Sequence, residues 1–267
     1  MMRGIYSQIG SLVPELPNFI TLLYHRYPDA PWAQFLHHWQ NLVFSILIAL
    51  LVCGITYLGM RARKMIPSGL QNFLELALEE VSKIILEVLG PRGKVFIPFL
   101  ITLFIYILSM NLAGLVPFMK APSSNLNITA SLAICVFCLV QYLNIKNMGF
   151  FGFLFHLAGS PKTALEWALA PLMFFLELIA QLARPITLAL RLFGNVLGED
   201  ILIGFFAVTG VALVSVFQSP VGIPLQIPAM FLALLTGLMQ ASVFTLLSAV
   251  YILLSMPHEE HPPSGNK

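Results

Sequence analysis

Charged residues are scarce in this sequence. Among 267 residues there are 14 Lys and Arg and 12 Asp and Glu. That is 10% of the chain, where a soluble domain carries roughly 25%. A soluble globule needs a charged surface, so the composition excludes a cytosolic enzyme, a nucleic-acid-binding protein and a disordered chain. With 58% hydrophobic residues and a mean hydropathy of +0.86, the sequence predicts an all-α, polytopic membrane protein. Its apolar runs are continuous, not short and alternating as in a membrane β-barrel.

Cysteine is also scarce, and nucleotide- or metal-binding motifs are missing. Cys53, Cys135 and Cys138 all lie in apolar runs, and an odd count does not indicate a disulfide framework. Cys135 and Cys138 form a CxxC without a second Cys or His pair nearby, so we expect a buried packing role. No GxxxxGK[ST] run exists, and residues 90–95, GPRGKV, are too short and lack the hydroxyl. We therefore expect no nucleotide, nucleic acid, cofactor or metal. The HEEH at 258–261 lacks the HExxH spacing and indicates a solvated tail.

Stretches without charge predict where the chain crosses the membrane. Residues 31–60, 95–119, 121–145 and 201–258 contain no Asp, Glu, Lys or Arg. Because one crossing needs about 20 apolar residues, the last stretch is long enough for two, broken at 218–224, QSPVGIP. We predict five crossings: residues 42–58, 95–116, 128–143, 163–216 and a last helix that ends before the tail. The Phe- and Gly-rich residues 148–161 are assigned to no element.

Residues 70–89 differ from the predicted crossings. Glu75, Glu79, Lys83 and Glu87 recur every four residues, and apolar residues cover most of the rest of the helix. This pattern predicts an amphipathic helix at the membrane interface.

The distribution of positive charge predicts the orientation. Nine of the fourteen Lys and Arg fall on one side: Arg61, Arg63, Lys64, Lys83, Arg92, Lys94, Lys146, Lys162 and Lys267. Arg3, Arg26 and Lys120 fall on the other side, and Arg184 and Arg191 lie within the membrane. The positive-inside rule therefore places the N-terminus outside and the C-terminus in the cytoplasm. The predicted organisation is an external segment over 1–40, one helical membrane domain over 41–258 and a cytoplasmic tail over 259–267.

Six polar or charged residues share one long apolar segment: Glu177, Gln181, Arg184, Arg191, Asn195 and Glu199. On one continuous helix they all lie within about 40° of a single line, although Pro185 is expected to kink it. Charge within a bilayer is costly and marks a functional site by default, so this stripe, Glu177 included, predicts an ion path. The alternative is that Glu177 and Arg184 form a structural ion pair. Arg191, flanked by apolar residues, stays protonated even when poorly solvated.

The last helix carries a second polar stripe. Gln226, Gln240 and Tyr251 lie close to one face, and Thr236 is near it. These groups suit a water path, but glutamines that only pack between helices produce the same pattern.

Residues 183–195, ARPITLALRLFGN, closely resemble the signature of subunit a of F-type ATP synthases. Further similarity lies in 111–117, NLAGLVP, in 122–129, PSSNLNIT, and in 240–251, QASVFTLLSAVY, with the HEEH that follows. The resemblance covers the chain from about residue 42 to its C-terminus, and the arginine motif is its most specific part.

The resemblance implies a fold and a function. The family has an outer N-terminus, a surface helix, a hairpin and two long, steeply tilted helices. Its role is a stator wall against a rotating ring of c subunits, held with the subunit b stalk and the rest of the ATP synthase in a lipid bilayer. Protons enter by an outer half-channel, neutralise a ring carboxylate and leave by an inner one. A bacterial inner membrane is the expected location, with a thylakoid membrane as the alternative.

The resemblance assigns the essential arginine to Arg191, which would attract the ring carboxylate, and a polar neighbour to Asn195. By spacing, Asp200 matches the half-channel carboxylate. The stripe favours Glu199 instead, because the side chain of Asp200 is rotated by about 100° from that of Glu199 around the helix axis. Both acids remain candidates.

The remaining assignments concern the path around this centre. Gln240 matches a glutamine that faces the arginine, and Gln226 matches a polar channel position. Asn111, Ser124 and Asn125 lie at the outer hairpin, where the entry path of the family opens.

The sequence departs from the family at two positions. Ala233 stands where some members carry a histidine or glutamate, and Gly114 where some carry an aspartate. In this respect the chain is similar to chloroplast-type members, and entry would depend more on Glu199, Asp200 and water.

Two other functions remain open. A secondary transporter or channel that acts alone predicts a substrate pocket and usually an internal repeat, and no repeat is visible. A membrane scaffold predicts that the intramembrane charges only hold helices together.

Overall fold

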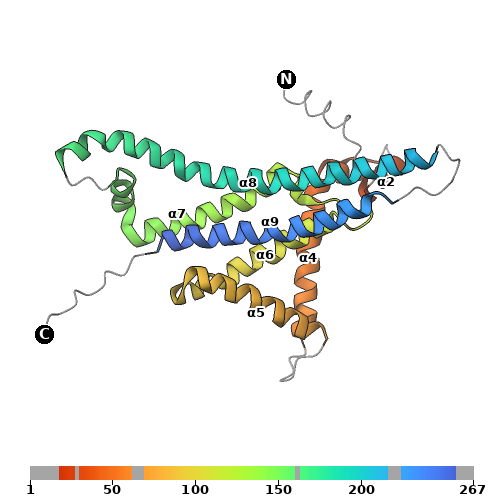
Figure 1. Cartoon of the computed structure of the whole chain (residues 1–267), viewed down its shortest axis with the longest axis horizontal. Coiled ribbons are helices and arrows are strands. Elements are labelled where there is room, and N and C mark those ends of the chain that lie inside the picture. Colours follow the sequence, from red (N-terminus) through yellow and green to blue (C-terminus); the bar gives the residue numbers. More distant parts are fainter. Residues whose placement is uncertain (1–17, 28–29, 62–68, 160–162, 216–223, 257–267) are drawn as a thin grey trace.

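The computed structural model describes residues 18–27, 30–61, 69–159, 163–215 and 224–256. Every regular element in this part of the chain is a helix, which confirms the all-α prediction (Figure 1). In order, the elements are α2 Phe19–Arg26, α3 Pro31–His38, α4 Gln40–Met60, α5 Leu70–Leu89, η1 Pro91–Phe96, α6 Ile97–Ala113, η2 Pro122–Ser124, α7 Leu126–Leu157, α8 Ala164–Ser215 and α9 Gln226–Leu254. The HEEH sequence and five of the cations used to predict orientation lie outside the described residues: Arg3, Arg63, Lys64, Lys162 and Lys267.

Within the described residues, five helices are long and apolar enough to cross a membrane, as predicted. They cover Gln40–Gly59, Gly93–Ala113, Leu126–Phe155, Glu166–Gly210 and Gln226–Leu254. The predicted interfacial segment forms a separate helix, α5, with the predicted bounds Leu70–Leu89. Its acidic residues are exposed, while Ile85 and Leu89 are buried in the core. Figure 1 shows α7, α8 and α9 lying side by side and running across the direction of α4.

Helix α7 is longer than predicted. The sequence predicts a crossing over 128–143, but α7 runs from Leu126 to Leu157 and includes most of the unassigned residues 148–161. The charge of Lys146 ends the apolar run, yet lysine favours helix and does not stop one. The interruption comes at Gly149, whose φ of 71° lies in a region open to glycine.

The predicted burial of Cys135 and Cys138 is wrong. Cys53, Cys135 and Cys138 are free thiols, and all three side chains are exposed on the isolated chain. The reason is physical: in a membrane protein an apolar residue can face lipid, so an apolar run does not tell which of its faces packs inward.

Two short helices in the N-terminal segment have no counterpart in the sequence analysis. Helices α2 and α3 pack against each other, and the ring of Tyr24 stacks on His37 at 4.6 Å. The N–H of Phe19 donates to the carbonyl of Phe118 over 3.0 Å, so α2 is tied to the segment between α6 and η2. These contacts fix α2 and α3 beside the start of α4.

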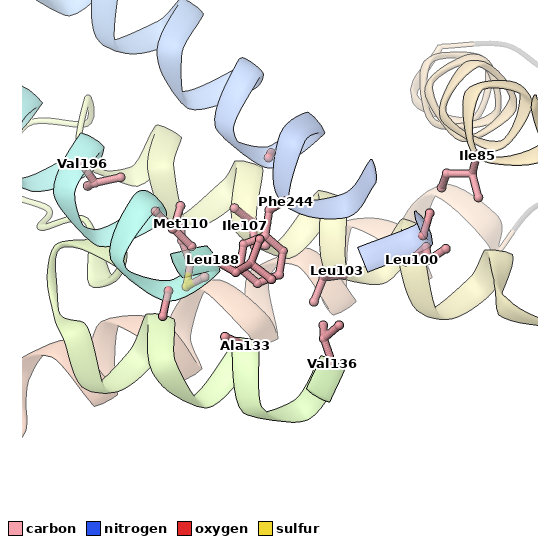
Figure 2. Packing of buried hydrophobic residues seen from close by; sticks show 14 of the residues in the cluster. Ile85, Leu100, Leu103, Ile107, Met110, Ala133, Val136, Leu188, Val196 and Phe244 are labelled. Atoms are coloured by element: carbon pink, nitrogen blue, oxygen red, sulfur yellow. The ribbon is translucent and has the colours of Figure 1, made fainter. Parts of the chain in front are cut away.

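The core lies where α6, α7, α8 and α9 meet. Leu100, Ile107 and Met110 of α6 are fully buried, as are Leu192 of α8 and Phe244 of α9. Figure 2 shows Ile107, Met110 and Phe244 converging between the helices. In lipid this close packing, more than the hydrophobic effect, holds helices together. It fixes the backbone positions from which the polar side chains project.

Candidate functional site

Polar side chains of α8 and α9 meet across the two helices. Asn195 Nδ2 donates to Gln240 Oε1 over 2.8 Å. One turn further along α8, Glu199 Oε1 accepts a hydrogen bond from Thr236 Oγ1. Gln240 is buried, and its Nε2 has no hydrogen-bond partner in the described part of the chain. The α9 stripe therefore faces the α8 stripe at these two levels.

A third contact shows that the register between the helices is regular. The guanidinium of Arg184 lies 5.4 Å from the ring centre of Tyr251, close enough for a cation–π interaction. Along α8, the three contacting residues Arg184, Asn195 and Glu199 are separated by 11 and then 4 residues. Along α9, their partners Tyr251, Gln240 and Thr236 are separated by the same 11 and 4 residues, in the opposite chain direction. The two helices thus run antiparallel and in step over about 22 Å.

Arg191 lies between these contacts and differs from them. Its side chain is exposed, and no hydrogen bond or ion pair is found for it among the described residues. The same register places Phe244, fully buried and apolar, at the level of Arg191 on α9. Leu188 and Leu192 of α8 are buried, so the helix turns its apolar face inward and Arg191 away from the core. An uncovered arginine within a span is costly, so this face requires a polar partner or water.

An open cavity of about 710 Å³ lies beside Glu177 and Arg184, near the C-terminal end of α9. Gln181 Nε2 donates to Glu177 Oε1 over 3.4 Å, and Arg184 Nη2 lies 3.9 Å from the same oxygen. Gln141 Nε2 of α7 donates to Gln181 Oε1 over 2.8 Å, while Gln141 Oε1 is buried without a partner among the described residues. The cavity is lined by Val140, Asn144, Met148, Phe153, Glu177, Gln181, Arg184, Tyr251, Leu254 and Ser255.

A second cavity, of about 720 Å³, lies at the opposite end of the α8 and α9 contact. It is lined by Gly114, Leu115, Val116, Pro117, Phe118, Met119, Ile203, Gln226 and Met230. Asp200 lies close to it, because a Cβ placed on Gly114 would be 3.6 Å from Asp200 Oδ1. The adjacent Glu199 turns instead toward Thr236 of α9. Glu199 therefore meets the α9 stripe at Thr236, and Asp200 lies beside Gly114 at the cavity.

Three other predicted site residues lie between the end of α6 and the start of α7: Asn111 in α6, Ser124 in η2 and Asn125 just after η2. Asn111 is buried: its Nδ2 donates to the carbonyl of Gly237 over 3.2 Å, and its Oδ1 accepts from Ser123 Oγ over 2.8 Å. Ser124 Oγ donates to the carbonyl of Ala121, and Asn125 Oδ1 accepts from the N–H of Asn127. Asn111 therefore joins α6 to α9 and to η2, while Ser124 and Asn125 make local hydrogen bonds in the turn between α6 and α7.

Two polar residues at the site were not singled out from the sequence. Gln141 is the link between α7 and Gln181, and Ser123 is the link between the turn and Asn111. Gln141 is a polar residue in the charge-free apolar stretch 121–145, and this feature could have identified it from the sequence. Ala233, at a position where the family varies, is buried and packs with Ile203. Among the described residues, no group of three or more His, Cys, Asp or Glu side chains is arranged to hold a metal ion.

Fold and site together define a multi-pass helical membrane protein with ionisable side chains inside its spans. The model of one family, described as ATP synthase A chain, matches residues 42–253. The chain is 67% identical over 259 residues to ATP synthase subunit a of Protochlamydia amoebophila (strain UWE25), covering 97% of this chain and 95% of that protein. It is 40% identical over 211 residues to ATP synthase subunit a of Trichlorobacter lovleyi, covering 79% and 84%. With the corresponding protein of Geobacter sulfurreducens it shares 38% over 208 residues, covering 78% and 82%.

The chain therefore belongs to the ATP synthase A chain family, and it is a membrane component of that complex. The family match begins at residue 42, which agrees with the extent of the resemblance in the sequence. Helices α2 and α3 precede the matched region.

Proposed function

We propose that this chain is the stationary wall of a rotary proton pathway, in which Arg191 separates two half-channels. The observation that carries the proposal is the exposed position of Arg191 on a helix that spans the membrane. A permanent positive charge cannot face lipid at low cost. A carboxylate on a partner is the group that suits it best, and a ring of c subunits supplies one. The subunit b stalk would hold this wall in place.

The two cavities support separate entry and exit paths. Their lining residues have no member in common. Along α8, Arg191 is 14 residues from Glu177 and 8 from Glu199, or about 21 Å and about 12 Å. A proton in either cavity thus has no continuous polar route past Arg191 within the chain. It has to ride on the rotor, and a membrane potential of 100 mV supplies about 2.3 kcal/mol per charge moved.

We assign the cavity with Gln226 to the outer side and the cavity with Glu177 to the cytoplasm. The positive charges of Arg61 and Lys146 support this orientation. The N-terminus then lies outside and the C-terminus inside a bacterial plasma membrane. Glu199, Asp200 and Gln226 form the outer half-channel, with Asn111, Ser124 and Asn125 as the turn that shapes its mouth. Asn195 and Gln240 flank the rotor contact.

Purification tests the assembly. The chain, tagged and isolated in mild detergent from the membranes of cells that express it, is expected to carry a ring of small hairpin subunits. The complete membrane part, reconstituted in lipid vesicles, conducts protons, while the chain alone does not. A chain that transports a solute or ions by itself would favour the stand-alone transporter and overturn the proposal.

Replacing Glu177 with Gln tests the inner half-channel. The exchange removes the carboxylate that lies beside Arg184 in the cavity. We expect passive proton conductance to fall several-fold, because protons leaving the rotor lose their acceptor, with the complex still assembled. The measurement is the decay of a pH gradient in vesicles that contain the membrane part.

Glu166→Gln is the matched control. Glu166 is exposed in the first turn of α8, where its carboxylate accepts from the N–H of Thr163 in a cap that glutamine also forms. This variant should conduct protons at the normal rate. Equal conductance of the Glu177→Gln variant and the unmodified chain would show that Glu177 does not take part in the inner half-channel.

A further inference from the structure

One hydroxyl group on α9 has more acceptors than it has protons. Thr236 Oγ1 is within hydrogen-bond reach of Glu199 Oε1 across the helix interface. It is also 2.9 Å from the carbonyl oxygen of Leu232 and 3.2 Å from that of Ala233, both on its own helix. A threonine hydroxyl has one hydrogen to donate and two lone pairs that accept. It can therefore serve Glu199 or the backbone of α9 at any one time, and exchange between them by rotating about one bond.

We propose that Thr236 is a positioning residue that holds Glu199 at the end of the outer half-channel in both protonation states. This inference rests on the function proposed above and deepens it. It makes Glu199 an acid of that half-channel that exchanges protons with the rotor, beside Asp200.

When Glu199 takes up a proton, every proton and hydrogen bond between Glu199 and Thr236 is accounted for. When Glu199 is ionised, the Thr236 hydroxyl donates to its carboxylate oxygen. A proton delivered by water from the outer cavity binds that carboxylate, and the new carboxyl O–H donates to Thr236 Oγ1. The threonine hydrogen then rotates to the carbonyl of Leu232, which lies within reach. Thr236 neither gains nor loses a proton, and Glu199 has a partner in each state.

Alternative partners for Glu199 are few on the elements packed around it. Among their described residues, α6, η2 and α9 contain no charged side chain. The charged groups in the neighbourhood are Asp200, Arg191 about 12 Å away along α8, and Lys120 between α6 and η2. Asp200 Oδ1 lies near Gly114, at 3.6 Å from a Cβ placed there. A hydroxyl that can both donate and accept suits a carboxyl group that changes its charge.

Position also favours Thr236 over its neighbours on α9. It lies one turn before Gln240, which contacts Asn195, and it continues the antiparallel register of the two stripes. Ala233, one turn before it, is packed against Ile203 and has no polar atom in its side chain. Within this stretch of α9, Thr236 is the side chain that contacts Glu199.

The test is Thr236→Val, which keeps the branched shape and removes the hydroxyl, compared with Thr236→Ser, which keeps the hydroxyl. We expect proton uptake from the outer side to slow by about tenfold in the valine variant, as for one lost hydrogen bond to a charged group. The serine variant should recover most of the rate. The dependence of the rate on outer pH should change, and the dependence on inner pH should not. Proton flux is measured in vesicles that contain the whole membrane part, with either side buffered separately.

Thr209→Val is the matched control. Thr209 is a half-buried threonine of α8 whose hydroxyl donates to the carbonyl of Phe205 on the same helix, over 2.8 Å. Its replacement should leave proton flux and assembly unchanged. A second measurement places Thr236→Val in a Glu199→Gln background, where no further loss is expected because the threonine acts through Glu199.

Three results of the flux measurements would overturn the inference: a normal rate in Thr236→Val, no recovery with serine, or a full additional loss in the Glu199→Gln background. Reduced assembly of the valine variant with normal assembly of the serine variant would assign Thr236 a purely structural role and also overturn it. The proposed function is judged separately, by the Arg191 variants. If these uncouple the complex while Thr236→Val has no effect, only the role of Thr236 is lost.

Discussion

Replacing Arg191 with Ala is expected to abolish proton-driven ATP synthesis while the complex still assembles. Arg191 is exposed on α8, and no contact within the described chain depends on it. Its neighbours Leu188 and Leu192 carry the packing of this part of the helix, so truncation at Arg191 leaves the core intact. Without the fixed charge, nothing attracts the ionised ring carboxylate. Protons can also pass between the half-channels without rotation, so synthesis stops and the membrane leaks.

The side chain, and not charge alone, sets the expected ranking of variants. Arg191→Lys keeps a positive charge only while the amine is protonated, and a poorly solvated lysine loses its proton more easily than arginine. It should therefore retain little synthesis. Arg61→Ala, at the exposed end of α4, removes an arginine outside the apolar layer and should synthesise ATP normally. ATP synthesis is measured in inverted membrane vesicles energised by respiration, together with the amount of assembled complex.

The outcome of this experiment separates three functions. A scaffold predicts that Arg191→Ala loses the complex, since its charges would hold helices together. A stand-alone transporter predicts that ATP synthesis does not depend on the residue. Normal coupled synthesis by the alanine variant would contradict the proposed function outright.

Charge was the feature from which most of the fold could be predicted. Because a charged residue is costly in the apolar layer, gaps between charges mark the spans, and all five predicted crossings correspond to long apolar helices. The same reasoning predicted the bounds of α5, because charges at every fourth residue lie on one face of a helix and that face has to contact water or lipid headgroups. It failed at the end of α7, where Lys146 lies outside the apolar run but inside the helix.

The contacts between helices could not be predicted from one sequence. Periodicity places Glu199 and Thr236 on faces of two helices, but register decides whether they meet, and register depends on packing among α6, α8 and α9. The same holds for Asn111, whose hydrogen bond to the backbone of Gly237 is not indicated by any pattern in the sequence. Helices α2 and α3 lie before the region matched by the family, and each has eight residues, too few for a periodic pattern to identify a helix from the sequence.

Replacing Gly237 with Leu is expected to remove most of the chain from the membrane. At this position α6 and α9 approach closely: a Cβ on Gly237 would lie 3.2 Å from Asn111 Cβ, and Asn111 Nδ2 donates to the Gly237 carbonyl. A leucine has to push the helices apart, which breaks this hydrogen bond and loosens the contact between Asn111 and Ser123. Overpacking alone costs about 1–3 kcal/mol, and the buried amide of Asn111 left without its partner adds about 1–3 kcal/mol.

A graded series shows whether the close approach is the cause. Gly237→Ala adds only the Cβ, which the neighbouring side chain accommodates by moving a few tenths of an ångström, so its loss should be small. Gly54→Leu makes the same exchange on α4, where a Cβ meets nothing within 4 Å. Leucine favours helix more than glycine does, so this control should be neutral or slightly stabilising. The measurements are the amount of chain in the membrane and the midpoint of thermal unfolding of the purified complex. If Gly237→Leu behaves like Gly54→Leu, the contact between α6 and α9 does not hold Asn111, and the turn that shapes the outer cavity has to be held by other contacts.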